Sequence, residues 1–398
     1  MTSRAALPLG QPRRALPPAS PAATAVLTCI LSAGPIARVG IARRTGLSQA
    51  AVTKAVTPLI DAGFVTFDGT RRGAAALGRP VTPIRAIPEA VRIIGIKVTE
   101  SEIIGVTTDF DATIVDRERR RLPKHTIGQV ARTVELVTRA LIKRLGPMQD
   151  RLVGVGVSVS GDIDTNAGRV RHSPLLGWHD VALRDLLEQR LSVPVRIDND
   201  VHALTLAEQW FGVGGGKVDS FVVVTIGSGI GCGIYLNGDV VNGSFGVAGE
   251  IGHLPLADAG LVCTCGRTNC VETVASSDAI LTTVRTATGR ADLDMAAVVR
   301  LAHEGDPAAV GAFNRAASVI GSAIAAVVNL IGPRVAVIEG EAVNNFEVYD
   351  AELRKAFAAN AFGAAAECQL RLRPHTFDAW ARGAAVSVLR AFVGQEGP

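Results

Sequence analysis

Three cysteines and a histidine lie close together in the second half of the sequence. Cys263, Cys265 and Cys270 fall within eight residues, and His253 precedes Cys263 by ten residues. Thiolate sulfur and imidazole nitrogen are ligands of tetrahedral structural zinc, and a closed set of four leaves no position for a substrate. The spacing, with a turn glycine at Gly266, therefore predicts a structural zinc ion rather than a zinc-dependent hydrolase. The alternative is that the three cysteines are free and buried.

Acidic and amide side chains gather around this cluster and around one helix start. The run Asp-Asn-Asp at 198–200 follows an apolar strand and opens a helix, which is where substrates bind in open α/β sheets. Glu250 and Glu272 flank the predicted zinc ligands in the sequence. Carboxylates with an amide suit the binding of vicinal hydroxyls, and one carboxylate could act as a general base. Taken singly, each acid could equally cap a helix or lie on the surface.

A glycine-rich turn lies between two predicted strands. It has the sequence Gly-Ser-Gly-Ile-Gly at 227–231. The glycines let a backbone approach a phosphate closely, and the serine adds a hydroxyl donor. Such turns are also common in hairpins, so the motif alone does not distinguish the two roles. The residues that could form a residual phosphate loop are Gly227, Ser228, Gly229 and Gly231.

The first 85 residues carry most of the positive charge. They contain 11 basic and 2 acidic side chains, whereas the remainder contains 30 basic and 35 acidic ones. The net charge of +4 over 398 residues therefore conceals a basic N-terminal segment joined to an acidic body. This asymmetry indicates a segment that binds a polyanion.

Within this basic segment, the pattern predicts a winged helix-turn-helix domain at 21–88. Apolar spacing marks helices from Pro21 and from Ile36, and Ser48 opens a third helix that Gly63 ends. A strand at 64–67 and a basic stretch that ends in Gly-Arg-Pro at 78–80 predict the wing. Because a helix fits the major groove, we expect DNA binding; such modules also serve protein contacts. The expected DNA contacts are Ser48, Gln49, Ala50, Thr53, Lys54, Thr57, Arg71, Arg72 and Arg79.

The rest of the chain predicts an α/β fold with two lobes. Residues 1–20, rich in Pro, Ala and Arg, are expected to form a disordered arm without a secretory signal. The uncharged stretch 316–333 is borderline in length for a membrane span, but its polar residues are typical of a buried core helix. After residue 88, strands and helices repeat in two weakly similar halves. We expect a small lobe at 89–198, completed by a C-terminal helix at 379–394, and a large lobe at 199–378 that holds the zinc site.

Several stretches together resemble the ROK family (repressors, open reading frames and kinases), in its sugar-responsive repressor branch. The resemblance begins near residue 22 and covers nearly all of the chain that follows. It implies an actin-like, ribonuclease-H-like two-lobed sugar-kinase fold with a cleft, preceded by a winged helix-turn-helix domain. The matching stretches are GVAGEIGHLPL and CTCGRTNCVE, which together are highly specific, and GVGVSVSGDID, IDNDVHALTLAE, TIGSGIGCGI and GPIARVGIARRTGLSQAAVTKAVTPLIDAGFV.

The resemblance also implies residue roles. Asp200 matches the catalytic base of the family's kinases, which removes a proton from the sugar hydroxyl. His253 matches both a zinc ligand and a sugar-binding residue. The matching zinc ligands are His253, Cys263, Cys265 and Cys270, and the matching sugar-binding positions are Gly161, Asn199, Asp200, Glu250, His253 and Glu272.

Two departures from the family pattern fall on the nucleotide side of the cleft. The kinases carry Asp-x-Gly-Gly-Thr after the first body strand to hold magnesium and phosphate, whereas this chain has the sequence KVTES from Lys97. A later adenosine-side motif has Glu341 where a glycine is usual. Ser160 in place of a proline and Asn269 in place of a glycine are milder changes. Because phosphoryl transfer depends on positioning phosphate and neutralising its charge, we expect no catalysis and regard Asp200 as a vestigial base.

These features predict a DNA-binding transcriptional regulator, a repressor of carbohydrate metabolism whose DNA binding is modulated by a sugar in a kinase-like cleft. Its expected cofactor is structural zinc, and its expected partners are operator DNA and a sugar effector. We expect a homodimer or homotetramer in the cytoplasm, without membrane contact. The alternative is an ATP-dependent kinase of a hexose or N-acetylhexosamine with an appended DNA-binding domain. The retained Asp200 favours that alternative, and Lys97 opposes it.

Overall fold

The chain forms two compact units, Met1–Lys217 with Phe377–Pro398 (unit 1) and Val218–Thr376 (unit 2). The computed structural model describes residues 14–17, 20–69, 82–215, 218–258, 260–373 and 376–394. Helix α12 (Phe377–Val393) returns to complete unit 1. The sequence predicts a large lobe that begins at residue 199, whereas the structure keeps α6 (Asp200–Phe211) in unit 1. The reason is close packing, because Gly383 of α12 lies directly against the backbone of Ala203 in α6.

Three helices and a two-stranded sheet form the N-terminal module of unit 1, as the sequence predicts for a winged helix-turn-helix. The side chains of Ser20 and Ser48 accept hydrogen bonds from Ala23 N and Ala51 N, which caps the first and third helices. The two strands are antiparallel. Residues 70–81 between them, with the predicted DNA contacts Arg71, Arg72 and Arg79, lie outside the described residues. The elements are α1 (Pro21–Ala33), α2 (Arg38–Thr45), α3 (Gln49–Asp61), β1 (Val65–Phe67) and β2 (Ile84–Ala86).

Arg14, in the segment expected to be a disordered arm, is held by several contacts. Its guanidinium donates hydrogen bonds to the carbonyl oxygens of Ala90 at 2.6 Å and Ala62 at 2.8 Å. It also lies 4.3 Å from the centroid of the Phe64 ring. Residues 1–13, 18 and 19 lie outside the described residues, so for them the expectation of disorder stays a prediction.

Each unit contains a five-stranded sheet, and the two sheets have the same topology. In each, the central strand pairs antiparallel with the strand that follows it and parallel with a later strand on its other side. The sequence prediction of two similar α/β halves is therefore confirmed. In unit 1 the order is β10 (Val195–Asn199), β6 (Leu152–Val159), β3 (Arg92–Val98), β4 (Glu102–Thr108), β5 (Ile114–Arg121). In unit 2 it is β13 (Asp239–Val240), β12 (Ile230–Leu236), β11 (Ser220–Ile226), β14 (Val335–Glu339), β15 (Gln369–Leu372).

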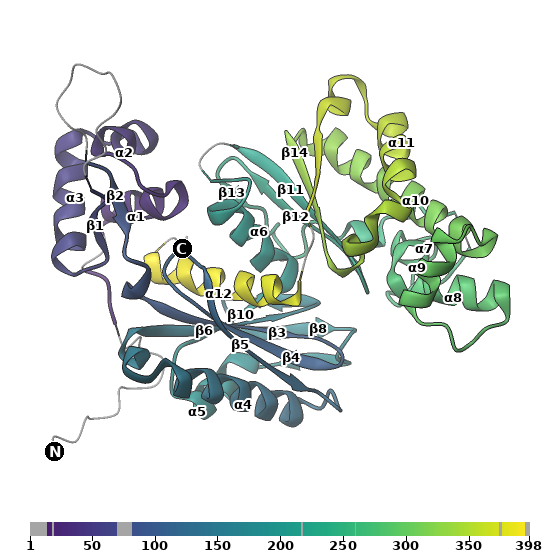
Figure 1. Ribbon diagram of the computed structural model, residues 1–398, viewed down its shortest axis with the longest axis horizontal. Coiled ribbons are helices and arrows are strands. Elements are labelled where there is room, and N and C mark those ends of the chain that lie inside the picture. Colours follow the sequence, from purple (N-terminus) through teal and green to yellow (C-terminus); the bar gives the residue numbers. More distant parts are fainter. Residues whose placement is uncertain are drawn as a thin grey trace. The chain divides into compact units, whose positions relative to one another are not determined.

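Helices cover both faces of the sheet in unit 1 (Figure 1). One face packs against α4 (Ile127–Leu145) and α5 (Leu183–Leu191), whose apolar residues share a core with the strands. The other face packs against α12, and the approach is so close that a side chain at Gly95 or Gly156 would overlap the helix backbone. A small antiparallel sheet of β7 (Asp162–Asp164), β8 (Arg169–Ser173) and β9 (Trp178–Val181) extends from the end of β6.

The N-terminal module and the body of unit 1 share one hydrophobic core. Val26 and Leu27 of α1 belong to the same buried cluster as Leu389 of α12 and Trp210 at the end of α6. The Thr24 hydroxyl of α1 also donates to the carbonyl oxygen of Val393, at 3.2 Å. The module is therefore packed onto the ends of α6 and α12 rather than tethered by a linker alone.

Unit 2 is built around one long apolar helix, α10 (Pro307–Ile331). Among the described residues it is the one helix long and apolar enough to cross a membrane, and 56% of its most apolar stretch is buried inside the protein. Ala316, Ile320 and Ile324 lie in the core against the sheet, as expected of a buried core helix. The other helices are α7 (Glu272–Ala275), α8 (Ser277–Thr288), α9 (Met295–His303) and α11 (Asp350–Asn360).

Candidate functional site

The four predicted zinc ligands converge in unit 2. Their ligand atoms all lie within 4.8 Å of one another. The sulfur atoms of Cys265 and Cys270 are 3.7 Å apart, and Nδ1 of His253 is 3.7 Å from Sγ of Cys263. A tetrahedral zinc ion with Zn–S bonds of about 2.3 Å requires sulfur–sulfur separations of about 3.8 Å. The donor set and its spacing therefore fit zinc.

The loop that carries the cysteines folds into a tight hairpin. Cys263 N donates to the Arg267 carbonyl oxygen at 2.7 Å, and Gly266 has a φ of +83°, a conformation that favours glycine. Burial and the neighbouring thiols raise the pKa of Cys270 to about 12. A metal ion bound here would have to displace that proton, because zinc binds the thiolate.

The remaining predicted sugar-binding residues of unit 2 adjoin this hairpin. His253 turns Nδ1 toward Cys263, while its Nε2 lies 3.9 Å from Oε2 of Glu250. Glu272 opens α7 two residues after Cys270, and its Oε2 accepts a hydrogen bond from Ile230 N at 3.2 Å. One imidazole thus connects the predicted zinc ligands to an acidic side chain.

The predicted sugar-binding residues of unit 1 meet at the start of α6. Asn199 caps the helix, because its Oδ1 accepts a hydrogen bond from His202 N at 3.0 Å. Its Nδ2 donates to the Gly161 carbonyl oxygen at 2.9 Å. Gly161 has a φ of +124°, and a side chain there would overlap the backbone at His172. The structure therefore groups the six predicted residues in two sets, with Gly161, Asn199 and Asp200 in unit 1 and Glu250, His253 and Glu272 in unit 2.

Asp200 is paired with Lys97 inside unit 1. The Lys97 ammonium donates to Oδ2 of Asp200, and the Ser160 hydroxyl donates to the same oxygen at 2.6 Å. Lys97 and Asp200 are 5% and 6% exposed, so the pair is buried. Burial alone would raise the pKa of the Asp200 carboxyl, but the Lys97 charge and the hydrogen bonds outweigh it and lower that pKa. Oδ1 accepts from Val201 N, so both oxygens are engaged.

The predicted phosphate loop in unit 2 is occupied by a carboxylate of the same unit. Oε1 of Glu341 accepts a hydrogen bond from Ser228 N at 2.8 Å. The carboxylate lies so close to Gly227 that a side chain at that position would overlap it. A backbone N–H that could bind a phosphate oxygen is therefore already bonded to an anion of the protein itself.

The exposed face of α3 carries the predicted base-reading residues. Gln49, Thr53, Lys54 and Thr57 are exposed, whereas Val52 on the opposite face is fully buried. Ser48 and Ala50 are exposed at the helix start, although the Ser48 hydroxyl is used as the cap. A polar helix face of this kind is presented to the major groove by helix-turn-helix proteins.

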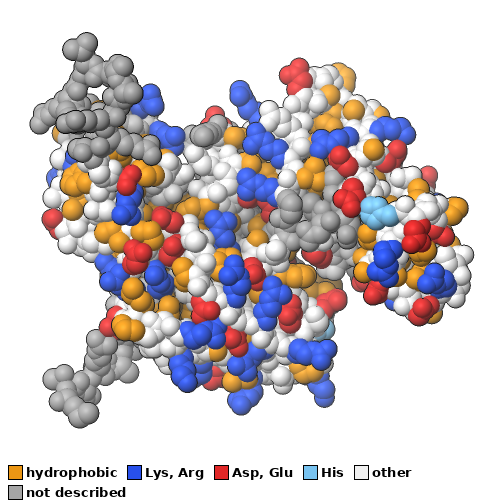
Figure 2. All heavy atoms as spheres, in the orientation of Figure 1, with side chains coloured by type: hydrophobic (Ala, Val, Ile, Leu, Met, Phe, Trp, Pro, Cys, Tyr) orange, Lys and Arg blue, Asp and Glu red, His pale blue; other side chains and the backbone are white. Residues whose placement is uncertain are grey.

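Three arginines of strand β5, Arg117, Arg119 and Arg120, are paired with acidic side chains of unit 1. Arg117 and Arg119 pair with Asp378 at 2.8 and 2.7 Å, and Arg144 pairs with Asp116 at 2.6 Å. Figure 2 accordingly shows blue and red side chains interleaved on the visible face of the body of unit 1. These ion pairs leave α3 as the stronger candidate for a nucleic-acid interface.

Two side chains contribute to the Asp200 site more than the sequence predicts. Ser160 is only a mild departure from the family pattern, yet its hydroxyl contacts the Asp200 carboxylate. Trp380 of α12 carries no sequence signal, and its ring centroid lies 5.0 Å from Nζ of Lys97. Only the fold brings these side chains to the end of β3.

Comparisons with known proteins agree with this architecture. The model of the ROK family matches residues 93–391. A putative xylose repressor of Caldicellulosiruptor sp. (strain Rt8B.4) is 30% identical over 350 residues, covering 85% of this chain and 87% of that protein. The crystal structure of a ROK family transcriptional regulator, a homolog of the E. coli MLC protein, superposes with a TM-score of 0.77 at 24% identity, covering 93% of this chain and 96% of the other.

A kinase of the family is similar over a smaller share of this chain. The ROK hexokinase of Thermus thermophilus superposes with a TM-score of 0.64 at 28% identity, covering 75% of this chain and 97% of that enzyme. The regulator's longer coverage agrees with the extra N-terminal module described above. Because the family model matches most of the chain and the xylose-repressor relative spans 85% of it, this protein belongs to the ROK family.

Proposed function

We propose that this protein is a DNA-binding transcriptional repressor whose binding to its operator responds to a sugar. The observation that carries the proposal is the buried Lys97–Asp200 pair on a body that retains the sugar-binding residue types. A relative of similar length is named a putative xylose repressor, and the N-terminal module presents a polar helix face. The proposal places the protein in the cytoplasm, as a homodimer or homotetramer, with one structural zinc ion in each chain.

In this proposal, the sugar is held by the six predicted residues. Carboxylates of Asp200, Glu250 and Glu272 accept hydrogen bonds from sugar hydroxyls, and Asn199 offers an amide. His253 contacts the sugar while it binds zinc, since its two nitrogens face different partners. The zinc ion supplies structural cross-linking of the hairpin, and the protein side chains do the binding.

Phosphoryl transfer requires a general base and donors for the nucleotide phosphates, and the contacts in this chain disfavour both. A general base needs a carboxylate that takes up a proton readily, and the Lys97 charge and the hydrogen bonds to Asp200 outweigh burial and lower the pKa of its carboxyl. A nucleotide needs donors for its phosphates, and the Ser228 backbone donor is occupied by Glu341. A sugar can still be bound, because binding requires no proton transfer.

Helix α6 connects the proposed sugar contacts to the DNA-binding module. It starts at Asp200, spans about 18 Å, and ends where Trp210 is buried against α1. We propose that sugar binding shifts α6 and thereby the module. Helix-turn-helix dimers bind half-sites at fixed spacings, so a modest reorientation of two modules lowers operator affinity.

The test combines DNA selection with a sugar panel. Purified protein is used to select operator fragments from genomic DNA, and pentoses, hexoses and N-acetylhexosamines are then added to the complex. One sugar is expected to release the DNA and to raise the melting temperature of the free protein. Asn199→Ala should retain DNA binding and lose the sugar response, while Lys54→Ala should do the reverse. Failure to select any specific DNA would refute the proposal.

The second candidate function is an ATP-dependent sugar kinase with a DNA-binding domain. It is favoured by the retained carboxylate of Asp200 and by the likeness to a ROK hexokinase. A coupled assay with ATP, magnesium and the same sugars separates the two functions. Turnover that disappears in Asp200→Asn would establish the kinase, whereas absence of turnover supports the regulator.

A further inference from the structure

One buried carboxylate, that of Asp198, joins the sugar-binding end of unit 1 to helix α12. Asp198 is 1% exposed and directly precedes the proposed sugar contact Asn199. Its Oδ1 accepts hydrogen bonds from Nδ1 of His202 at 2.7 Å and from the Thr165 hydroxyl at 3.1 Å. Its Oδ2 accepts a hydrogen bond from the hydroxyl of Ser387 in α12. Side chains from the end of β7, from α6 and from α12 thus meet at one carboxylate.

The surroundings of Asp198 keep its carboxylate ionised. Burial alone would raise the pKa of Asp198, but His202, Arg196 and the hydrogen bond from Ser387 outweigh it and lower that pKa. An ionised carboxylate only accepts hydrogen bonds, so the His202 ring donates through Nδ1. Arg196 donates from Nε to Oγ of Ser387 at 2.8 Å, which leaves the hydroxyl hydrogen for Asp198. Because losing a donor to a buried charge is costly, the donors of this carboxylate keep fixed positions relative to one another.

His202 connects the buried carboxylate to the sugar contacts. Its backbone N–H donates to Oδ1 of Asn199 at 3.0 Å, while its ring donates to Asp198. The Asn199 amide also donates from Nδ2 to the Gly161 carbonyl oxygen. A sugar hydroxyl that bonds to this amide would compete with both backbone contacts. The first turn of α6, which carries the His202 ring, is therefore sensitive to what Asn199 binds.

Helix α12 continues from the buried carboxylate to the DNA-binding module. Beyond Ser387 the helix ends at Val393, whose carbonyl oxygen accepts a hydrogen bond from the Thr24 hydroxyl of α1 at 3.2 Å. Leu389 of α12 lies in the same buried cluster as Val26 of α1. A helix packed in this way moves as a rigid element, so a displacement at Ser387 reaches α1.

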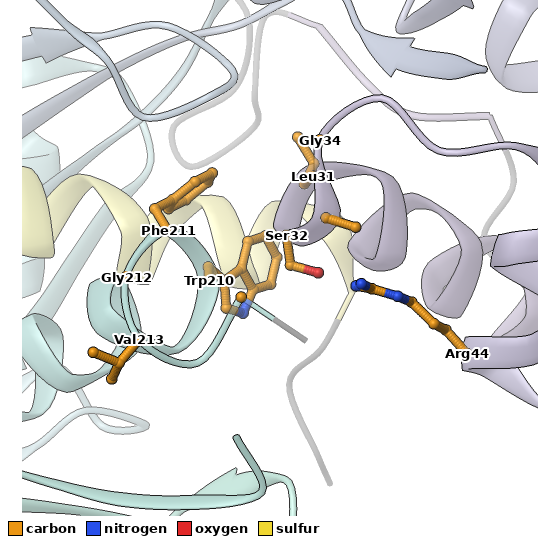
Figure 3. Close-up of a pocket in the computed structure, with 10 residues that line it drawn as sticks. Leu31, Ser32, Gly34, Arg44, Trp210, Phe211, Gly212 and Val213 are labelled. Carbon is orange, nitrogen blue, oxygen red and sulfur yellow. The ribbon is translucent and has the colours of Figure 1, made fainter. Parts of the chain in front are cut away.

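The end of α6 also meets the module, but the contact there is apolar. Figure 3 shows Trp210 of α6 beside Leu31 and Ser32 of α1, at the edge of a groove. Among the described residues, the indole N–H of Trp210 has no hydrogen-bond partner. Apolar contacts are not directional, so they hold two helices together without fixing their relative position. The hydrogen-bonded route through α12 is therefore the better transmitter of a small shift.

We propose that the Asp198 carboxylate couples the sugar site to the DNA-binding module, with His202 and Ser387 as the positioning residues on its two sides. A bound sugar displaces the His202 ring, the Asp198 carboxylate follows its donor, and α12 carries the change to α1. The side chains of His202 and Ser387 contact neither the sugar nor the DNA in this mechanism. The inference rests on the proposed sugar response and adds the route by which that response is transmitted.

The experiment measures the affinity of the full chain for its selected operator fragment, without sugar and with saturating xylose, glucose or N-acetylglucosamine. The ratio of the two affinities is the sugar response. Ser387→Ala and His202→Ala should each lower this ratio about tenfold, while calorimetry still detects binding of the sugar to the DNA-free chain. Ser158→Ala is the matched control and should leave the ratio unchanged. Ser158 is fully buried and pairs with Asp198 across β6 and β10, but its hydroxyl donates to the Ile96 carbonyl oxygen.

A merely structural role of these side chains would give a different result. A variant that only loosens unit 1 changes operator affinity by the same factor with and without sugar, so its ratio stays that of wild type. An unchanged ratio in Ser387→Ala and His202→Ala would overturn the proposal, and so would an equal fall in Ser158→Ala. His202 is only half-buried, so its variant keeps the test decisive if Ser387→Ala does not fold.

The double variant His202→Ala/Ser387→Ala tests whether the two side chains act on one route. Because both contact the same carboxylate, the double variant should lose no more of the sugar response than the more affected single variant. Losses that add up would mean two independent routes and would contradict the proposal. A wild-type chain that binds its operator and is released by none of the sugars would refute the proposed sugar response itself. A wild-type response that persists in both single variants would refute only the coupling through Asp198.

Discussion

Lys97 in unit 1 and Glu341 in unit 2 each form a contact within their own unit, and the two contacts can be compared. Each stands where the resemblance to the kinases implies a different residue type, and each is bonded to a group of its own unit. Lys97 is a cation that engages a carboxylate, whereas Glu341 is an anion that engages a backbone N–H. Opposite charges thus each satisfy a polar group of their own unit, because Lys97 binds the carboxylate of Asp200 and Glu341 binds the backbone N–H of Ser228.

The two contacts differ in their surroundings. The Lys97–Asp200 pair is buried, so removing one partner leaves an uncompensated charge in the interior. Glu341 is only half-buried, and the Ser228 N–H that it engages is accessible to water if the carboxylate is removed. We therefore expect the unit 1 contact to be structurally indispensable and the unit 2 contact to be replaceable. The measurements below test this difference between the two contacts.

The largest effect is expected from removing the zinc ion predicted for unit 2. Glu272, whose carboxylate accepts a hydrogen bond from Ile230 N in the glycine turn, follows the predicted ligand Cys270 by two residues. Structural zinc binding provides on the order of 10 kcal/mol. Elemental analysis should find one zinc ion per chain, and chelation should lower the melting temperature and abolish the sugar response. Cys29→Ser is the matched control for Cys270→Ser, since Cys29 lies outside the cluster; equal zinc content in both variants would contradict the assignment.

Removing one partner of the Lys97–Asp200 pair should have the second largest effect. Lys97→Met leaves Asp200 buried and unpaired, so it should reduce the free energy of unfolding by about 3–5 kcal/mol. The double variant Lys97→Met/Asp200→Asn removes both charges and should recover much of that loss. Urea unfolding measures both, with the exposed Lys124→Met as control. A loss below about 1 kcal/mol in the single variant would mean that the pair is not buried as the structure has it.

The pH dependence of the pair gives a smaller effect. The pKa of Asp200 is lowered in the folded state, mainly through Lys97 acting against burial. Its stabilisation is therefore present above the unfolded pKa of about 3.9, and it is lost as pH falls through the lower folded value. The loss is about 1.4 kcal/mol for each unit between the two values. The stability difference between wild type and the double variant should shrink below about pH 4; a difference that shrinks on raising the pH would contradict the assignment.

Restoring glycine at 341 should have the smallest effect on stability. Glu341→Gly removes one hydrogen bond from a half-buried carboxylate, so we expect a loss of about 1 kcal/mol or less. It also frees the Ser228 N–H, so weak binding of an ATP analogue should appear in calorimetry without turnover, because Lys97 still engages Asp200. Glu304→Gly, at an exposed helix end, is the control. Turnover in the Glu341→Gly variant would show that Lys97 does not prevent catalysis.

How much of the structure could be predicted depended on how far apart the interacting residues lie in the sequence. The convergence of His253 with the three cysteines and the α3 cap were predictable because the residues of each lie close together in the sequence, where spacing limits geometry. Lys97 was identified as an altered position, but its bond to Asp200, 103 residues away, required the register of β3 with β6 and β10. The burial of Trp210 could not be predicted from the sequence, because it depends on the N-terminal module, whose residues are far from Trp210 in the chain.

The close packing of α12 against Gly95 and Gly156 also has a consequence for biosynthesis. This helix is translated after all of unit 2, so the sheet of unit 1 and the core of the N-terminal module stay open on one side until the ribosome reaches it. Unit 2, whose strands and helices are contiguous in sequence, can fold first. A nascent or prematurely terminated chain would therefore carry α3 without the support that positions it, and only a fully synthesised polypeptide would compete for an operator.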